Sequence, residues 1–257
     1  MMKELLFIGA AILLAVASVR AGDTPRKVTI DWYGQSCFLI TTPEGTKVVL
    51  DPVNIKDYKV PKEVTPDIVT VSHNHFDHNA VETVSGHPVV IYGKTRDVAD
   101  SLQKFIPVDT TIKGVRIYDV VASHFNPQEN PLTNAIFVFE FDSLRIVHLG
   151  DVGTTLSDEQ IKKIGRVDIL MIPVGGKYTI WGATADSVVA QLKPTRVVIP
   201  MHFKTRVADF LPYTADDFVK GKANVERVAG HEYTLDFAAS ASGLKYVVFD
   251  CFSETGK

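Results

Sequence analysis

The chain has 257 residues, of which 46% are hydrophobic and 22% are charged. This is the composition of a globular protein and excludes disordered, collagen-like and coiled-coil classes. The formal net charge is −3 at pH 7, so no basic excess indicates nucleic acid or an anionic membrane as a partner.

The first residues differ from the rest of the chain. An unbroken apolar run occupies residues 5–19, with Lys3 before it and a small-residue sequence ending at Ala21 after it. A membrane-spanning helix needs roughly 20 residues, and a shorter run of this kind is typical of a signal peptide. We therefore expect residues 1–21 to be a signal peptide and residues 22–257 to form a single domain. The protein would be exported, to a periplasm or outside the cell. An uncleaved N-terminal anchor is the alternative.

No later stretch is apolar for long enough to cross a membrane. Two cysteines, Cys37 and Cys251, lie near opposite ends of the predicted mature chain. An oxidising compartment would permit a disulfide between them, and two free thiols fit the sequence equally well. The sequence leaves this pairing and the oligomeric state open.

The first half of the chain predicts short strands joined by tight turns. A turn at Pro43-Glu44-Gly45 and another at Asp142-Ser143 each separate two apolar runs. A helical spacing occurs at residues 96–105, and residues 126–134 form a polar loop. The expected strands are residues 28–42, 47–51, 67–72, 88–92, 112–123, 135–141 and 144–149.

The second half alternates helices and strands. Helices are expected at residues 157–164, with Ser157 as N-cap, and at 184–192; strands are expected at 168–174 and 196–201. This pattern predicts helices packed outside β-sheets. A layered α/β fold and a sandwich fit it equally well, and the motifs below decide between them.

A dense cluster of metal-binding residue types follows the strand predicted at 67–72. It contains His73, His75, Asp77 and His78 within six positions. In an extended chain, residues two apart point to the same side, so His73 and His75 can converge on one cation. A following turn would direct Asp77 and His78 to a neighbouring point. Imidazole and carboxylate ligands suit zinc, and also iron or manganese.

Three further candidate ligands stand at the ends of apolar runs. They are His124, Asp151 and His202. Polar residues placed just after buried strands are typical of a site built along one edge of a sheet. The order of these residues after the first cluster completes a recognisable pattern.

That pattern resembles the metallo-β-lactamase superfamily. His73, His75, Asp77 and His78 match its HxHxDH signature, and His124, Asp151 and His202 match its three later ligands. The surrounding sequence is most similar to small metal-dependent hydrolases related to L-ascorbate-6-phosphate lactonase. The stretches that carry this similarity are residues 34–40, 50–52, 150–153, 172–180 and 199–203. The resemblance covers about residues 27–205.

The resemblance implies an α+β fold, the four-layer αββα sandwich, with two divalent metal ions between the sheet edges. Zinc is the expected metal, with manganese or iron as alternatives. One ion would take His73, His75 and His124. The other would take Asp77, His78 and His202, and Asp151 would bridge the two.

Residues around these ligands have expected roles too. Asp51 matches a carboxylate that orients a ligand histidine, although a turn before Pro52 would also explain it. Tyr178 and Thr179 either donate hydrogen bonds to a substrate or pack a loop. Gln35 stands where many relatives have histidine. Phe76 either narrows the pocket or packs beside it. His148 is expected to be buried support, and residues 126–134 and 204–213 are candidate pocket walls.

The implied activity is hydrolysis of a small ester, lactone or phosphodiester. Two divalent cations lower the pKa of a shared water, which makes hydroxide available near neutral pH. Asp77 would hold this nucleophile and carry its proton to the leaving group. The expected partner is a small-molecule substrate, with no nucleic acid and no membrane beyond the export signal. β-Lactam hydrolysis and non-catalytic metal binding are the alternatives.

Overall fold

The computed structural model describes residues 26–96, 103–124 and 133–252. The predicted signal peptide, most of the helix expected at 96–105 and most of the loop expected at 126–134 lie outside these ranges. Phe105, at the end of that helix, instead forms an isolated bridge with Lys94.

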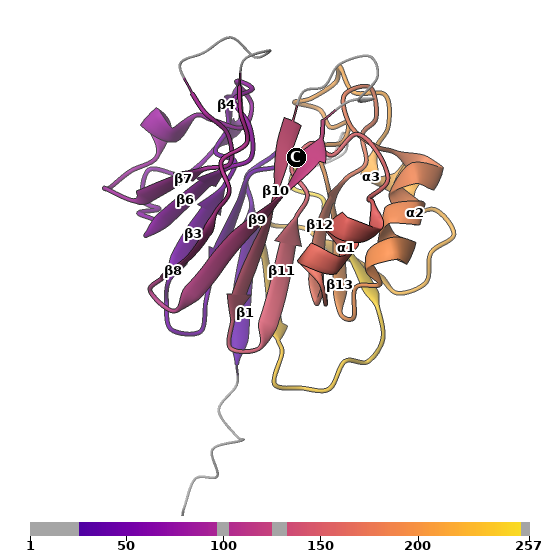
Figure 1. Cartoon of the computed structure of the whole chain (residues 1–257). Coiled ribbons are helices and arrows are strands. Elements are labelled where there is room, and N and C mark those ends of the chain that lie inside the picture. The colour runs from indigo at the N-terminus through magenta and orange to yellow at the C-terminus, as the bar shows by residue number, and fades with distance from the viewer. Residues whose placement is uncertain (1–25, 97–102, 125–132, 253–257) are drawn as a thin grey trace, which may run out of the picture.

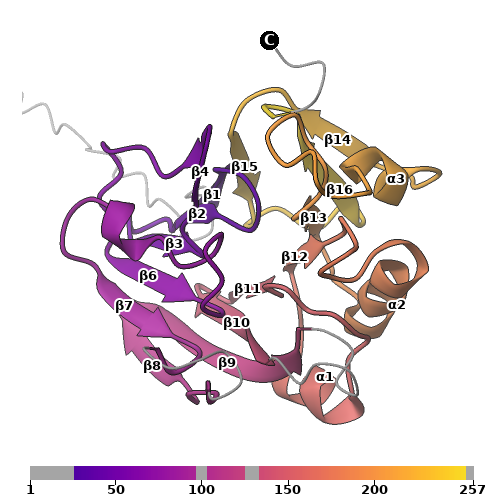
Figure 2. The ribbon, with the colours of Figure 1, turned by 90° about the horizontal axis from the view of Figure 1, so that it is seen from above.

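Two β-sheets form the centre of the described chain (Figures 1 and 2). The first has the order β15-β1-β2-β3-β6-β7 and the second the order β14-β16-β13-β12-β11-β10-β9-β8. The strands of the first sheet are β1 (Lys27–Trp32), β2 (Phe38–Thr41), β3 (Lys47–Leu50), β6 (Ile68–Val71), β7 (Val89–Tyr92) and β15 (Glu232–Asp236). Those of the second are β8 (Asp109–Ile112), β9 (Val115–Ser123), β10 (Thr133–Phe141), β11 (Leu144–His148), β12 (Ile169–Pro173), β13 (Val197–Met201), β14 (Val225–Val228) and β16 (Lys245–Phe249). A small separate hairpin is made by β4 (Asn54–Ile55) and β5 (Tyr58–Lys59).

Helices cover the outer face of the second sheet. They are α1 (Asp158–Ile164), α2 (Gly182–Leu192) and α3 (Ala215–Val219), and Figure 2 shows them on the side away from the first sheet. The first half of the described chain adds the 3-10 helix η1 (Val81–Thr83). Helices outside two packed sheets are the arrangement predicted from sequence, and the sandwich reading is confirmed.

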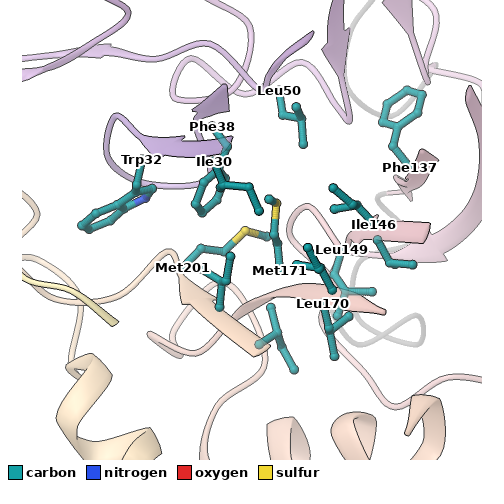
Figure 3. Packing of buried hydrophobic residues seen from close by; sticks show 14 of the residues in the cluster. Ile30, Trp32, Phe38, Leu50, Phe137, Ile146, Leu149, Leu170, Met171 and Met201 are labelled. Atoms are coloured by element: carbon teal, nitrogen blue, oxygen red, sulfur yellow. The ribbon is translucent and has the colours of Figure 1, made fainter. Parts of the chain in front are cut away.

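The main core fills the space between the two sheets. Figure 3 shows side chains from both sheets meeting there, among them Ile30, Phe38, Met171 and Met201, which are fully buried. Strands β12 and β13 are buried at every position because the first sheet covers one face and helices cover the other. Such strands read in the sequence as continuous apolar runs.

Local chemistry explains where several elements begin and end. Ser157 caps α1 by accepting a hydrogen bond from the backbone N–H of Gln160, whose side chain accepts one from the N–H of Ser157. This reciprocal capping box satisfies two N–H groups at the helix start. The N-cap predicted at Ser157 is therefore confirmed.

The structure corrects three sequence predictions. The strand expected at 28–42 is two strands, because Gly34, with φ of 100°, turns the chain between β1 and β2. The strand expected at 112–123 begins in β8 and turns at Lys113-Gly114 before β9. The chain after Val207, for which no elements were predicted, contains α3, β14, β15 and β16, and β15 pairs with β1.

Both cysteines are free thiols in the structure, Cys37 buried and Cys251 partly buried. Among the described residues, no helix is long and apolar enough to cross a membrane.

Candidate metal centre

The predicted ligands come from strand ends that meet at one edge of the sandwich. His73 follows β6 by two residues, His124 comes directly after β9, and His202 comes directly after β13. Asp151 lies at the end of the turn that follows β11, and β11, β12 and β13 run parallel to one another. Carboxyl ends of parallel strands open at the same edge of a sheet. The fold therefore gathers residues that are up to 129 positions apart.

Asp151 lies at the centre of this cluster. Its Oδ2 atom is 3.3 Å from Nε2 of His78, 3.3 Å from Nε2 of His124 and 3.4 Å from Nε2 of His202. Nε2 of His73 lies 3.8 Å from the same oxygen. One carboxylate thus faces histidines from both halves of the predicted site.

The potential ligand atoms fall into two main groups. The first is made of His73, His75, His124 and Asp151, and the second of Asp77, His78 and His202. Within each group the ligand atoms all lie within 4.8 Å of one another. This division is the one that the family resemblance implies.

Asp51 orients two of the histidines. Its Oδ2 atom lies 2.8 Å from Nδ1 of His78 and accepts a hydrogen bond of 2.6 Å from the Ser72 hydroxyl. The Ser72 Oγ atom in turn lies 2.9 Å from Nδ1 of His73. Since the Ser72 proton goes to Asp51, Nδ1 of His73 is the donor to Ser72. A proton on Nδ1 leaves the Nε2 lone pair of each ring available to a cation.

The buried atoms at the centre fit a cation. Among the described residues, Nε2 of His73, Nε2 of His78 and Oδ1 of Asp151 are buried without a hydrogen-bond partner. Buried polar atoms are nearly always paired, and an unfilled lone pair in the interior is costly. Imidazole nitrogen and carboxylate oxygen together form a donor set that suits zinc. The residues present therefore fit a divalent metal.

Burial and mutual charge interactions shift the pKa values of the clustered histidines and carboxylates. Burial lowers the pKa of His73 well below its usual value, and His78 acts in the same direction. Burial also acts to lower the pKa of His78, but the carboxylates of Asp151 and Asp77 outweigh it and raise that pKa well above normal. For Asp151, burial acts upward, and His202 and His78 hold the pKa well below its usual value. A cation entering the site would displace the extra proton that these carboxylates favour on His78.

Gln35 positions Asp77. Its Nε2 atom donates a 3.0 Å hydrogen bond to Oδ2 of Asp77, and its backbone carbonyl accepts from the indole of Trp32 and from the N–H of His202. Gln35 is itself buried. At this position, where the family resemblance leads us to expect histidine, a glutamine amide supplies the donor to Asp77.

Two residues that position ligands, Ser72 and Asn134, were not predicted from the sequence. Ser72 links Asp51 to His73, as described above. The fully buried Asn134 donates to the carbonyl of Leu149 at 2.8 Å and accepts from the N–H of Asp151 at 3.0 Å, so it holds both ends of the turn that presents Asp151. The sequence placed Asn134 at the end of a polar loop, whereas the structure places it in strand β10, beside the buried apolar run that begins at Ala135.

Of the other residues predicted near the site, two are buried and one is exposed to the cavity. His148 is fully buried, and its Nε2 donates to the carbonyl of Ser36 at 2.9 Å, which places it as support behind the cluster. Thr179 is buried and donates its hydroxyl to the carbonyl of Ile180. Tyr178, by contrast, is exposed in the wall of a cavity.

That cavity has a volume of about 490 Å³ and opens onto the cluster. Its lining is formed by His75, Phe76, Asp77, Asp151, Tyr178, His202 and Phe210. Phe210 comes from the segment 204–213 that the sequence marked as a candidate wall.

Known proteins show the same combination of fold and metal dependence. The profile of the family described as β-lactamase superfamily domain matches residues 29–202. A UPF0173 metal-dependent hydrolase of Methanoregula boonei is 32% identical over 190 residues, covering 68% of this chain and 82% of the relative. Another from Pyrobaculum neutrophilum is 31% identical over 221 residues, covering 78% of this chain and 92% of the relative.

A solved structure agrees with these relatives. A Thermotoga maritima protein described as a Zn-dependent hydrolase of the metallo-β-lactamase superfamily matches with a TM-score of 0.68 and 34% identity. The match covers 86% of this chain and 98% of that chain. The region matched by the family profile includes every strand end that carries a predicted ligand, and β14, β15 and β16 lie beyond it.

Proposed function

Because the chain belongs to the metallo-β-lactamase superfamily and is a metal-dependent hydrolase of that fold, we propose that it uses two divalent ions to hydrolyse a small ester, lactone or phosphodiester. Zinc is the proposed metal, with manganese or iron as alternatives. The observation that carries this proposal is the position of Asp151. Its Oδ2 atom lies 3.3 Å from a histidine of the first group, His124, and 3.3 Å from one of the second, His78.

The first ion would be held by His73, His75 and His124, and the second by Asp77, His78 and His202, with Asp151 shared. When bound, divalent ions supply water activation near neutral pH and stabilise negative charge developing on the substrate.

Asp77 is the proposed catalytic residue. Its carboxylate lines the cavity and lies 3.7 Å from Nε2 of both His78 and His202. Burial acts to raise its pKa, but His78 and the hydrogen bond with His202 hold it well below the usual value. An ionised carboxylate that Gln35 fixes in place can accept a proton from water and pass it to the leaving group.

A hydrolysis panel tests this function. The chain from residue 22, loaded with zinc or manganese, is offered an aryl ester, a lactone, a bis-aryl phosphodiester and a β-lactam, each with and without chelator. We expect chelator-sensitive cleavage of the ester, lactone or phosphodiester. Replacing His75 and Asp77 by alanine should abolish it, whereas Asp158→Asn on exposed α1 should leave it intact. Turnover that survives both alanine variants would overturn the proposal, and so would silence across the panel with metal bound.

Export is a separate proposal that rests on residues 1–21. Removal of this segment in a host with a secretory pathway should give a mature N-terminus near Gly22 in the exported fraction. N-terminal sequencing measures this directly. A full-length chain retained in the membrane fraction would instead support the anchor.

A further inference from the structure

The cavity beside the metal cluster has two chemically distinct parts. Four of its lining residues, His75, Asp77, Asp151 and His202, belong to the cluster itself. The other lining residues in the described part of the chain are aromatic: Phe76, Tyr178 and Phe210. A substrate that reaches the cluster therefore lies against aromatic side chains.

These aromatic side chains are exposed to an unusual degree. The exposed fractions are 73% for Phe76, 38% for Tyr178 and 41% for Phe210. They come from three separate segments: the turn between His75 and Asp77, the loop after β12 and the loop after β13. Large apolar side chains that converge on one cavity instead of joining the core mark a binding surface.

The backbone fixes Phe76 next to the reacting centre. The N–H of His78 donates to the carbonyl of His75 at 3.0 Å, which closes the turn that contains Phe76. Because His75 and Asp77, on either side of Phe76, are proposed ligands, metal binding would hold this turn rigidly. Phe76 therefore forms a fixed wall of the pocket.

Among the described residues, no lysine or arginine lines the cavity. Lys177, next in sequence to Tyr178, has its ammonium group 4.9 Å from the Tyr178 ring centroid and is not part of the lining. Proteins bind phosphate groups mainly through arginine, lysine or clustered N–H donors. The described lining thus offers an apolar contact, and no cationic side chain, to the part of a substrate remote from the metals.

We propose that the substrate is an uncharged carboxylic ester or lactone with an apolar acyl group, which Phe76, Tyr178 and Phe210 bind. This proposal rests on the proposed hydrolase function and narrows it. A phosphate group remote from the scissile bond, as in a phosphorylated lactone, would lie against walls whose described residues include no cation, and the aromatic side chains offer a phosphodiester no charged partner beyond the metals. An apolar acyl chain gains binding energy from each methylene removed from water.

A series of p-nitrophenyl esters with acetyl, butyryl and octanoyl groups tests the proposal on the zinc-loaded chain. The leaving group is constant, so the acyl contact alone changes. We expect kcat/KM to rise with chain length, by up to about fourfold for each methylene that becomes buried. Bis-p-nitrophenyl phosphate should be a poorer substrate than the octanoyl ester.

Variants assign the effect to the aromatic wall. Phe76→Leu and Phe210→Ala should each lower the octanoyl-to-acetyl ratio of kcat/KM at least about threefold, mainly through KM, with zinc content unchanged. Val89→Ala is the control, because Val89 is 50% exposed on β7 and is not among the residues that line the cavity. Its ratio should match that of the unchanged chain.

The outcomes separate the two proposals. Chelator-sensitive ester hydrolysis with no dependence on chain length, or with the same ratio in all variants, overturns this proposal and leaves the hydrolase function standing. A higher kcat/KM for the phosphodiester than for the octanoyl ester also overturns this proposal and leaves the hydrolase function standing. If no substrate is cleaved, the hydrolase proposal fails, and calorimetry with octanoate and acetate still tests the pocket. Octanoate should bind more tightly than acetate and lose that advantage in Phe210→Ala; equal affinities would overturn the pocket assignment.

Discussion

The carboxylate of Asp51 lies 2.8 Å from Nδ1 of His78, so a side chain just after β3 orients a proposed ligand that follows β6. Asp51 itself is fully buried and has a positive φ of 42°, a backbone conformation uncommon outside glycine and asparagine-like residues. Through Ser72, the same carboxylate reaches His73. One residue therefore prepares a histidine in each half of the proposed centre.

Replacing Asp51 by asparagine should weaken metal binding. The carboxylate accepts from the Ser72 hydroxyl and from His78 at Oδ2 and from the backbone N–H of Ser72 at Oδ1. An amide has one acceptor oxygen, so its NH2 group would face a donor on one side, and the two imidazoles lose their fixed orientation. Loss of such a partner typically costs about 10- to 100-fold in metal affinity. Chelator competition on the purified chain measures the change. Asp158→Asn is the control, and equal affinities in the two variants would contradict the assigned role.

Gln35→Leu should lower kcat while leaving metal content intact. It removes the donor to Asp77, and a hydrogen bond to a charged group contributes about 1.5–3 kcal/mol, which corresponds to a loss of roughly tenfold or more. Gln35→His restores a donor at the same positive φ of 48° and should recover part of the rate. If the leucine and histidine variants are equally slow, Gln35 does not act through Asp77.

Gly150→Ala should destabilise the fold locally. Gly150 has φ of 53°, and an added Cβ would lie 2.2 Å from Oδ1 of Asn134, the side chain that holds the Asp151 turn. Gly114 also has a positive φ, of 80°, but an added Cβ there meets nothing within 4 Å. Gly114→Ala therefore matches the backbone strain without the clash. We expect Gly150→Ala to lose at least about 1–3 kcal/mol more free energy of unfolding than Gly114→Ala; similar losses in urea denaturation would contradict this.

Asp119 should make stability depend on pH. Burial raises the pKa of this carboxyl on β9 to about 7, whereas its value in the unfolded chain is about 3.9. Between these values the folded state binds more protons than the unfolded state, so the free energy of unfolding falls as pH rises from about 4 to 7.

Asp119→Asn should remove that loss, because the amide is neutral and its oxygen can still accept the hydrogen bond from the N–H of Val108. Relative to the unchanged chain, the variant should gain stability between pH 4.5 and pH 7.5. The gain should be on the order of 1 kcal/mol, since the carboxyl is partly exposed and screened by solvent. Urea denaturation of metal-free protein at both pH values measures it. The prediction is wrong if the difference between the two proteins does not change with pH.

Much of the site was predictable because its ligands follow apolar strands, and strand ends meet at a sheet edge. The His73 cluster, His124, Asp151 and His202 could be placed on this ground, and the structure brings them together. The contacts that support these ligands could not be predicted from the sequence. Asn134 and Ser72 act through hydrogen bonds to chemically ordinary neighbours, and such bonds leave no periodic signal.

In the fold too, local features could be predicted from the sequence and long-range contacts could not. Capping at Ser157 and the continuous apolar runs of β12 and β13 are local features, so the sequence predicts them. The pairing of β15 with β1 joins residues about 200 positions apart, such as Ile30 and Tyr233, and β15 is a short strand with exposed positions. Its place at the edge of the first sheet depends on the rest of the fold.

The proposed dinuclear centre requires two metal ions that share Asp151. Anomalous X-ray diffraction from crystals of the zinc-loaded chain, measured at the zinc absorption edge, tests it most directly. We predict two peaks, one against His73, His75 and His124 and the other against Asp77, His78 and His202, with the Asp151 carboxylate contacting both. A single peak, or two peaks of which only one contacts Asp151, would contradict the account.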